Sequence, residues 1–322
     1  MNVAKSEPSI KKCLVLGGSG FIGSHLVERL VASGYKVRVL ARHIQKNKLD
    51  VDNKKESNIE FFSADFTNES DLEMALNDVD YVFHLVSTTT PKHSNENPIH
   101  DIEMNLIGTI KLLDLIKLKK DIKLVFISSG GTVYGIPEET PIAEKHSTKP
   151  ICSYGITKLA IEKYLYLYNY LYGLDYVVLR VSNPYGEKQN PDSSQGVIAV
   201  FMLRLLKDQP IQIWGDGSVA RDFIYIDDVI SAIIAAMNSS SVERVFNIGS
   251  GIPVDINEII KSIEVVSDKL SNIEYMEGRK LDVPVNCLDI SLAVKHLGWT
   301  PQTQLLDGLK KTWCWLKGNY IK

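Results

Sequence analysis

The chain has 322 residues, of which 44% are hydrophobic and 23% are charged. This length is enough for one large domain or two smaller ones with a full apolar core. With 36 basic and 39 acidic residues the formal net charge is −3, so no general basic field attracts nucleic acid or an anionic membrane. We therefore expect neither as a partner, and an anionic substrate would need local arginines.

The four cysteines are scattered without a CxxC pair, so they predict neither a disulfide framework nor a metal site. The amino-terminal sequence MNVAKSEPSIKK lacks the apolar core of a secretory signal. The longest apolar helical pattern, residues 229–237, is too short to cross a bilayer. We expect a cytoplasmic protein in which the polar residues 1–11 are disordered.

Residues 12–42 predict a strand, a glycine turn, a helix and a second strand. The glycines Gly17, Gly20 and Gly23 give the spacing GxxGxxG, which differs by one residue from the GxGxxG fingerprint of dinucleotide-binding units. Glycine lets a pyrophosphate approach the backbone, and the N–H groups at the helix start attract the anion. A purely structural turn is the alternative, but the strands on both sides favour a dinucleotide.

The second strand of this unit ends at Ala41 and Arg42, with no carboxylate. NAD-binding units usually place an acidic residue there, where it binds the adenosine ribose. The Arg42 guanidinium favours NADP(H), or use of both NADP(H) and NAD(H). An arginine stacked on adenine or solvated at the strand end is the alternative interpretation.

Strands and helices alternate through the rest of the first 180 residues. The expected strands cover 59–62, 81–86, 123–128 and 175–180, and the expected helices cover 69–76, 98–119 and 153–172. This alternation predicts an α/β fold with a doubly wound parallel (Rossmann) sheet covered on both faces. Ligands of such sheets bind at the carboxyl ends of the strands.

The regular alternation stops at the NPYG segment, residues 183–186. Shorter strands and helices follow, which predict a smaller mixed α/β lobe that closes a cleft. We expect residues 1–180 to form the dinucleotide-binding domain and residues 181–322 the substrate lobe, with some exchange of chain between them.

Tyr154 and Lys158 stand four residues apart in a predicted helix, so they share one face of it. A tyrosine with an ordinary pKa of about 10 is a poor base at neutral pH. A neighbouring ammonium stabilises the phenolate, and an oxidised nicotinamide adds to that effect. Tyr154 can then exchange a proton with a sugar hydroxyl or ketone while a hydride moves to or from the nicotinamide. The pair alone is weak evidence, but its place after the fifth predicted strand makes it a candidate catalytic pair.

Several further segments, together with this pair, resemble the extended short-chain dehydrogenase/reductase family of nucleotide-sugar epimerases, dehydratases and reductases. The segments are GGSGFIGSHL (17–26), HLVS (84–87), NLIGT (105–109), SSGGTVYG (128–135), NPYG, GDGSVARDFIYIDDV (215–229), FNIGSG (246–251) and GRKLDVP (278–284). They extend over nearly the whole chain, and as a set they are highly specific.

The resemblance implies a role for particular residues. Cofactor contacts are implied for Gly17, Gly20, Phe21, Ile22, Gly23, Arg42, Asp65, Phe66, Leu85, Val86, Ser87, Asn105, Ser128, Tyr154 and Lys158. Substrate contacts are implied for Ser129, Tyr154, Asn183, Arg221, Arg279 and Asp282. Arg221 and Arg279 would bind the substrate diphosphate, which suits a chain without net positive charge.

The chain departs from the family pattern at Gly130, where members usually carry a catalytic serine or threonine. Its role would pass to Ser129 or Thr132, of which we favour Ser129. Dehydratases of the family place two acidic residues directly after that position, but here they are Gly131 and Thr132. Dehydration is therefore not expected, and no metal is implied.

Two reactions then fit the chain. The one we favour from the sequence is an NAD(P)H-dependent reductase that delivers hydride to C4 of a dTDP- or UDP-linked 4-keto-6-deoxyhexose for surface polysaccharide synthesis. The alternative is an NAD-dependent 4-epimerase of a UDP-hexose or UDP-N-acetylhexosamine. An epimerase regenerates its cofactor and gains nothing from NADPH, so Arg42 favours the reductase. A non-catalytic dinucleotide-binding protein is a third possibility.

The resemblance also implies a homodimer, formed through the helices near 98–119 and 153–172. Five tyrosines alternate along the second of these helices, and we expect most of them at an interface or partly exposed. His84 and His93 are expected to be structural.

Overall fold

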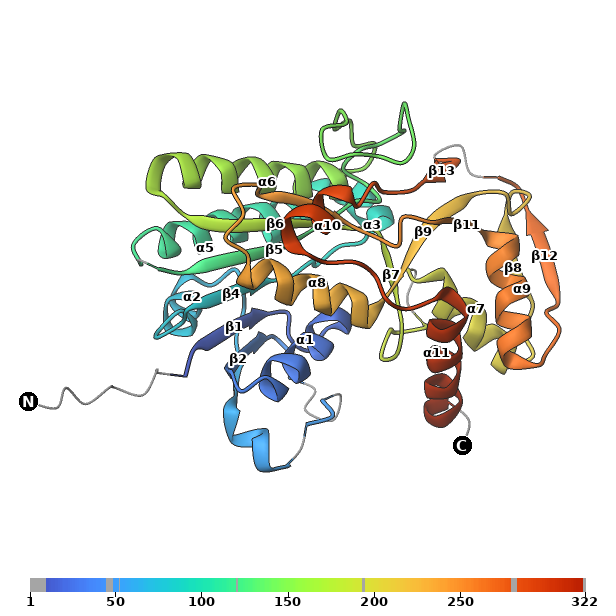
Figure 1. The fold of residues 1–322 in the computed structure, drawn as a ribbon, viewed down its shortest axis with the longest axis horizontal. Helices are drawn as coiled ribbons and strands as arrows, with labels where there is room; N and C mark the ends of the chain where they lie inside the picture. The colour runs from blue at the N-terminus through green and yellow to red at the C-terminus, as the bar shows by residue number, and fades with distance from the viewer. Residues whose placement is uncertain are drawn as a thin grey trace, which may run out of the picture.

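The computed structural model describes residues 10–44, 49–51, 53–119, 121–192, 195–278 and 283–320. Its centre is a seven-stranded parallel sheet with the strand order β10-β6-β5-β4-β1-β2-β3 (Figure 1). The strands are β1 (Lys12–Leu16), β2 (Lys36–Ala41), β3 (Ile59–Ser63), β4 (Tyr81–His84), β5 (Lys123–Ser129), β6 (Asp175–Val181) and β10 (Val245–Ile248). The predicted doubly wound sheet is confirmed.

Helices cover both faces of this sheet. One face carries α1 (Phe21–Ala32) and α8 (Ile226–Asn238); the other carries α2 (Glu69–Ala75), α5 (Gly108–Ile116) and α6 (Ser153–Tyr172). Figure 1 shows the pair α5 and α6 on the opposite side of the sheet from α1 and α8. Alternate residues of β5 serve the two cores, since Val125 and Ile127 belong to one apolar cluster and Leu124 and Phe126 to the other. Burial on both faces explains why the strands are continuous apolar runs in the sequence.

The helix expected over 98–119 has a different form in the structure. It consists of α4 (Pro98–Asp101), a π-helical segment η3 (Ile102–Ile107) and α5. At its centre Gly108 lies so close to the Phe66 ring that a Cβ would be 2.7 Å from a ring carbon. The π-helical turn also brings the Asn105 amide onto the Asp101 carboxylate, at 3.0 Å.

The second lobe contains two small sheets (Figure 1). One has β7 (Asn183–Tyr185), β9 (Ala220–Tyr225), β11 (Pro253–Asp255) and β13 (Val285–Asn286), and the other has β8 (Ile211–Trp214) and β12 (Ile273–Met276). Its helices are α7 (Val197–Leu206), α9 (Ile256–Ser267) and α11 (Leu305–Tyr320). The chain returns to the first lobe twice: α8 leads to β10, which pairs with β6 at the edge of the main sheet, and α10 (Ser291–Leu297) later packs on β10 and α8.

Two short elements complete the first lobe, η2 (Asn53–Asn58) and α3 (Pro91–Glu96). The sequence analysis did not predict α3, nor the short strands β7, β11, β12 and β13. Among the described residues, no helix is both long and apolar enough to cross a membrane.

A buried ion pair ties α6 to the main sheet. Arg180 of β6 donates to both carboxylate oxygens of Glu162, and the shortest of these contacts is 2.6 Å. The Ser128 hydroxyl at the end of β5 also donates to Glu162, at 2.5 Å, and the Tyr134 hydroxyl accepts from Arg180 at 2.9 Å. Both charged side chains are more than nine-tenths buried, so each depends on the other for compensation.

Glu162→Ala should therefore lower the free energy of unfolding by about 3–5 kcal/mol, because it leaves the Arg180 guanidinium buried and unpaired. The matched control is Glu138→Ala, which removes an ion pair with Lys149 that is exposed on both sides and should change stability by less than about 1 kcal/mol. Urea unfolding followed by circular dichroism measures both. Equal losses in the two variants would contradict this account.

Candidate functional site

A pocket of about 200 Å³ opens at the carboxyl ends of the central strands. It is lined by Gly17, Ser19, Gly20, Leu40, Ala41, Arg42, Ala64, Asp65, Phe66, Thr67, Leu85, Val86, Ser87, Thr88 and Met104. The glycine turn, Arg42, the pair Asp65 and Phe66, and residues 85–87, all implied by the sequence as cofactor contacts, thus come together from four strand ends. This edge of the sheet is the one where α/β folds bind ligands.

The glycine turn has the close packing that a bound pyrophosphate requires. Gly17 has φ +84°, and a Cβ there would lie 3.3 Å from the Val86 amide nitrogen. Gly23 is packed even more tightly, because its Cβ would lie 2.2 Å from the Gly17 carbonyl oxygen. Gly20 caps α1 without a side-chain hydrogen bond, so first-turn N–H groups are left for an anion. The turn therefore fits a dinucleotide.

The positive charge of Arg42, just after β2, has a carboxylate neighbour, Asp65. Arg42 and Asp65 line the same pocket. The Thr67 amide and hydroxyl, each 2.8 Å from the Asp65 carboxylate, lower the pKa of that carboxyl, and the positive charge of Arg42 lowers it further. Asp65 is thus ionised at neutral pH and opposes a second anion beside Arg42.

His84 lies at the end of β4 between two aromatic rings, Phe66 and Phe126, with centroids 5.0 and 5.2 Å away. The Thr109 hydroxyl donates to the Asn105 carbonyl at 2.6 Å, so it must accept from His84 Nε2 at 2.8 Å. Burial, helped by the charge of Lys158, lowers the pKa of His84 to about 3. His84 is therefore neutral. It packs between Phe66 and Phe126 and bonds Thr109, in line with the expected structural role.

Tyr154 and Lys158 lie on α6, and Lys158 is close enough to His84 for its charge to act on it. The Lys158 Nζ donates to the Ile127 carbonyl at 2.9 Å and lies 5.7 Å from the centre of the Tyr154 ring. Burial lowers the pKa of Lys158 to about 8 and raises that of Tyr154 to about 12, while the Ser87 side chain opposes the rise at Tyr154. At pH 7 the pair is thus an ammonium beside a neutral phenol.

The start of α6 is held by a helix that the sequence analysis missed. The Ser94 hydroxyl of α3 accepts from the Tyr154 amide at 2.9 Å, and the Asn95 side chain accepts from the Ser153 amide at 2.8 Å. These bonds satisfy N–H groups that a helix start leaves open. The sequence does carry a local signal for α3, because Thr90 caps it and Pro91 occupies its first position.

Position 130 is tightly packed. A Cβ there would lie 2.5 Å from Leu288 Cδ1 and 3.0 Å from the Arg180 carbonyl oxygen, so the usual serine would fit only if the Leu288 side chain shifted. The Ser129 Oγ lies 3.8 Å from the point that a Gly131 Cβ would occupy, and no other heavy atom comes within 4 Å of that point. The Thr132 Oγ1 is buried and has no hydrogen-bond partner among the described residues. Of the two candidate hydroxyls, the one on the half-buried Ser129 is therefore the more accessible to a ligand.

Other implied cofactor residues lie beside the pocket or beneath it. Asn105 accepts from the Thr88 amide at 3.0 Å and so orders a wall of the pocket. The Ser128 hydroxyl is buried against Glu162. Phe21 and Ile22 begin α1, directly after Gly20.

Two of the implied substrate residues, Asn183 and Arg221, lie in the second lobe. Asn183 of β7 donates to the Asp222 carbonyl at 3.0 Å, and Arg221 of β9 donates to the Val283 carbonyl at 2.6 Å. These two strands pair side by side. Arg279 and Asp282 lie outside the residues that the structure describes.

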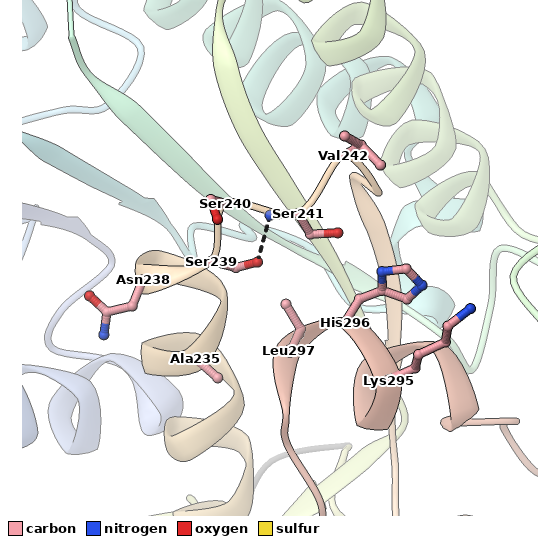
Figure 2. Close-up of a pocket in the computed structure, with 9 residues that line it drawn as sticks. All are labelled: Ala235, Asn238, Ser239, Ser240, Ser241, Val242, Lys295, His296 and Leu297. Carbon is pink, nitrogen blue, oxygen red and sulfur yellow. Dashed lines mark hydrogen bonds between the residues drawn. The ribbon is translucent and has the colours of Figure 1, made fainter.

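A larger hollow, of about 510 Å³, lies at the opposite edge of the sheet. There the serine-rich loop after α8, residues 239–241, faces the end of α10 with Lys295 and His296 (Figure 2). Lys123, the first residue of β5, donates to the Ser239 carbonyl, which places this hollow at the amino ends of the strands. It contains none of the implied residues. Within the described ranges, no cluster of three or more His, Cys, Asp or Glu residues could hold a metal ion.

Proteins with known names are similar to this chain in sequence over almost its whole length. A protein from Methanocaldococcus jannaschii named putative UDP-glucose 4-epimerase is 40% identical over 95% of this chain and 98% of its own length. The Escherichia coli dTDP-4-dehydro-6-deoxyglucose reductase is 32% identical over 92% of this chain and 95% of its own length.

Solved structures of UDP-glucose 4-epimerases superpose closely. The Thermotoga maritima enzyme, determined with UDP-glucose, gives a TM-score of 0.90 at 35% identity, over 95% of this chain and 99% of that one. The Thermus thermophilus enzyme, determined with NAD, gives 0.87 at 32% identity, over 96% and 99%.

A family model described as the NAD dependent epimerase/dehydratase family matches residues 13–249. That match covers the glycine turn, the Tyr154–Lys158 pair and β10, and it agrees with the resemblance seen in the sequence. The chain is an enzyme that belongs to the NAD dependent epimerase/dehydratase family.

Proposed function

We propose that this enzyme is an NAD-dependent 4-epimerase of a UDP-linked hexose. The observation that carries the proposal is the Tyr154–Lys158 pair, held at the carboxyl edge of the sheet beside a pocket whose glycine turn fits a pyrophosphate. Relatives named as nucleotide-sugar 4-epimerases outnumber the reductase among the most similar ones. They support the epimerase over the reductase that we favoured from the sequence.

The charges around Arg42 also favour NAD. In the sequence Arg42 suggested a site for the 2′-phosphate of NADP, and that suggestion was the main argument for a reductase. In the structure the ionised Asp65 shares the pocket with it. A carboxylate there repels a phosphate and suits ribose hydroxyls better.

The residues of the site divide the chemistry among them. A nicotinamide bound here would accept the hydride of the sugar C4 and supply it again to the opposite face of the resulting ketone. Tyr154 takes the proton of the 4-hydroxyl and later gives it back, while Lys158 stabilises the phenolate. Because burial is the main cause that raises the pKa of Tyr154 to about 12, this base depends on the positive charge beside it. Ser129 donates to the C4 oxygen, and Asn183 and Arg221 hold the diphosphate.

The test is turnover of UDP-glucose by the purified protein without added NAD(P)H. We expect UDP-galactose to form until the two sugars reach equilibrium, because an epimerase regenerates its cofactor in each cycle. Chromatography measures the sugars, and absorbance of the reduced nicotinamide detects any net reduction. Tyr154→Phe should lower kcat by at least about 100-fold, the usual contribution of a positioned acid–base group.

The control is Tyr320→Phe, at the end of the last helix, which should keep full activity. Two results would overturn the proposal. One is consumption of NAD(P)H in proportion to a 4-keto-6-deoxy sugar, with no exchange of UDP-hexoses. The other is an active Tyr154→Phe variant.

We also propose that two copies associate through the helices η3, α5 and α6. The exposed faces of these helices carry several large apolar side chains: Ile102, Ile107, Ile156, Tyr166, Leu167, Tyr170 and Leu171. An apolar surface of this size on adjoining helices is typical of an interface. Tyr168 alone of the tyrosine series is buried, where its hydroxyl bonds Asp114 at 2.8 Å.

Sedimentation velocity should report a species of twice 36.1 kDa. Introducing a charge with Leu167→Glu should shift it to the monomer, because a carboxylate cannot be buried unpaired in an apolar contact. Val265→Glu, on an exposed position of α9, is the control and should leave the dimer intact. A monomer at micromolar concentration in the unmodified protein would refute the interface.

A further inference from the structure

The carboxylate of Asp101, at the end of α4, is fully buried yet lies outside the pocket. It accepts four hydrogen bonds. The Oδ1 atom accepts from the Thr89 hydroxyl and from the Asn105 amide at 3.0 Å. The Oδ2 atom accepts from the Ser153 hydroxyl at 2.9 Å and the Thr157 hydroxyl at 2.7 Å. Burying a charged carboxylate is costly, and these four hydrogen bonds compensate for that cost.

The four donors come from three segments that surround the candidate catalytic pair. Thr89 follows the strand end that contributes residues 85–88 to the pocket, and Asn105 orders the Thr88 amide. Ser153 directly precedes Tyr154, and Thr157 directly precedes Lys158. One carboxylate thus clamps the first turn of α6 on both sides of Tyr154 and links that turn to the pocket wall.

Asp101 also acts through its charge. It raises the pKa of Lys158 against the lowering effect of burial, and it raises the pKa of Tyr154 and Cys152. The other charged group acting on Lys158 is Glu162, farther along α6, whose carboxylate is already paired with Arg180. His84, from the sheet side, is neutral, and the Thr89 and Asn105 side chains that face Asp101 carry no charge. Of these two carboxylates near Lys158, Asp101 is the one that has no ion pair of its own among the described residues.

We propose that Asp101 is a positioning residue for the reaction, which holds Tyr154 and Lys158 in place and supplies the negative charge that keeps the buried Lys158 protonated. The proposal rests on the proposed role of the pair in proton transfer. Asp101 itself touches no substrate, because it is buried behind α6. It affects the reaction in two ways: it fixes the position of the first turn of α6, and it influences the protonation state of Lys158.

Asp101→Asn tests the charge with little change in shape, because the amide can donate to the two hydroxyls of α6 that the carboxylate now accepts from. The readout is the titration of Lys158 by NMR of 13C-labelled lysine in the free enzyme, with its signal assigned by loss in Lys158→Met. We expect the midpoint to fall by about one pH unit, the usual effect of one nearby opposite charge. The alkaline fall of kcat/KM should move to lower pH by the same amount.

Ser153→Ala with Thr157→Val is the matched variant, because it removes the clamp on α6 and keeps the charge. It should leave the Lys158 midpoint unchanged or higher, while kcat falls about 10-fold with little change in KM. This variant also tests the proposal if Asp101→Asn fails to fold. An unchanged Lys158 midpoint in Asp101→Asn, or an unchanged kcat in the double variant, would overturn it. The titration needs no substrate, so it remains informative even if the enzyme proves not to be an epimerase.

Discussion

The hydrogen bond from Lys158 to the Ile127 carbonyl joins α6 to the end of β5, and the geometry of the site depends on it. Tyr154 lies one helical turn earlier and is linked to the Ser87 side chain of the pocket, so the anchoring of this turn helps to set the position of the phenol. The same helix is held further along by the Glu162–Arg180 pair and at its start by side chains of α3. The proposed role of Tyr154 as a base would need such a rigid support, since small displacements cost large factors in rate.

The two lobes meet on a second polar anchor, the buried carboxylate of Asp222 in β9. It accepts from the Ser250 amide and hydroxyl, both at 2.7 Å, and from the Leu288 amide at 3.3 Å. Leu288 is the residue that occupies the space beside Gly130. The glycine at position 130 and the Asp222 anchor thus meet at Leu288, whose side chain lies where a serine Cβ would be.

The sequence predicted most accurately the parts of the molecule whose signals are local. The bounds of α6 agree with the structure at both ends, and the unit over 12–42 has its strands and helix where apolar periodicity and glycines placed them. The strands β7, β11 and β13 have only two or three residues, too few for a periodic pattern. Asp101 gave no signal either, because its partners Thr89 and Thr157 are 12 and 56 residues away. Likewise, only the folded chain shows that Leu288 packs against position 130.

The measurement that tests the account most directly follows a deuterium atom placed at C4 of UDP-glucose. If the enzyme moves that hydride to a bound nicotinamide and back, UDP-galactose formed in ordinary water should keep the deuterium at C4. This result is expected because the pocket would hold the reduced cofactor until the hydride returns. UDP-galactose that has lost the label to solvent, or label that accumulates in free reduced cofactor, would contradict the account.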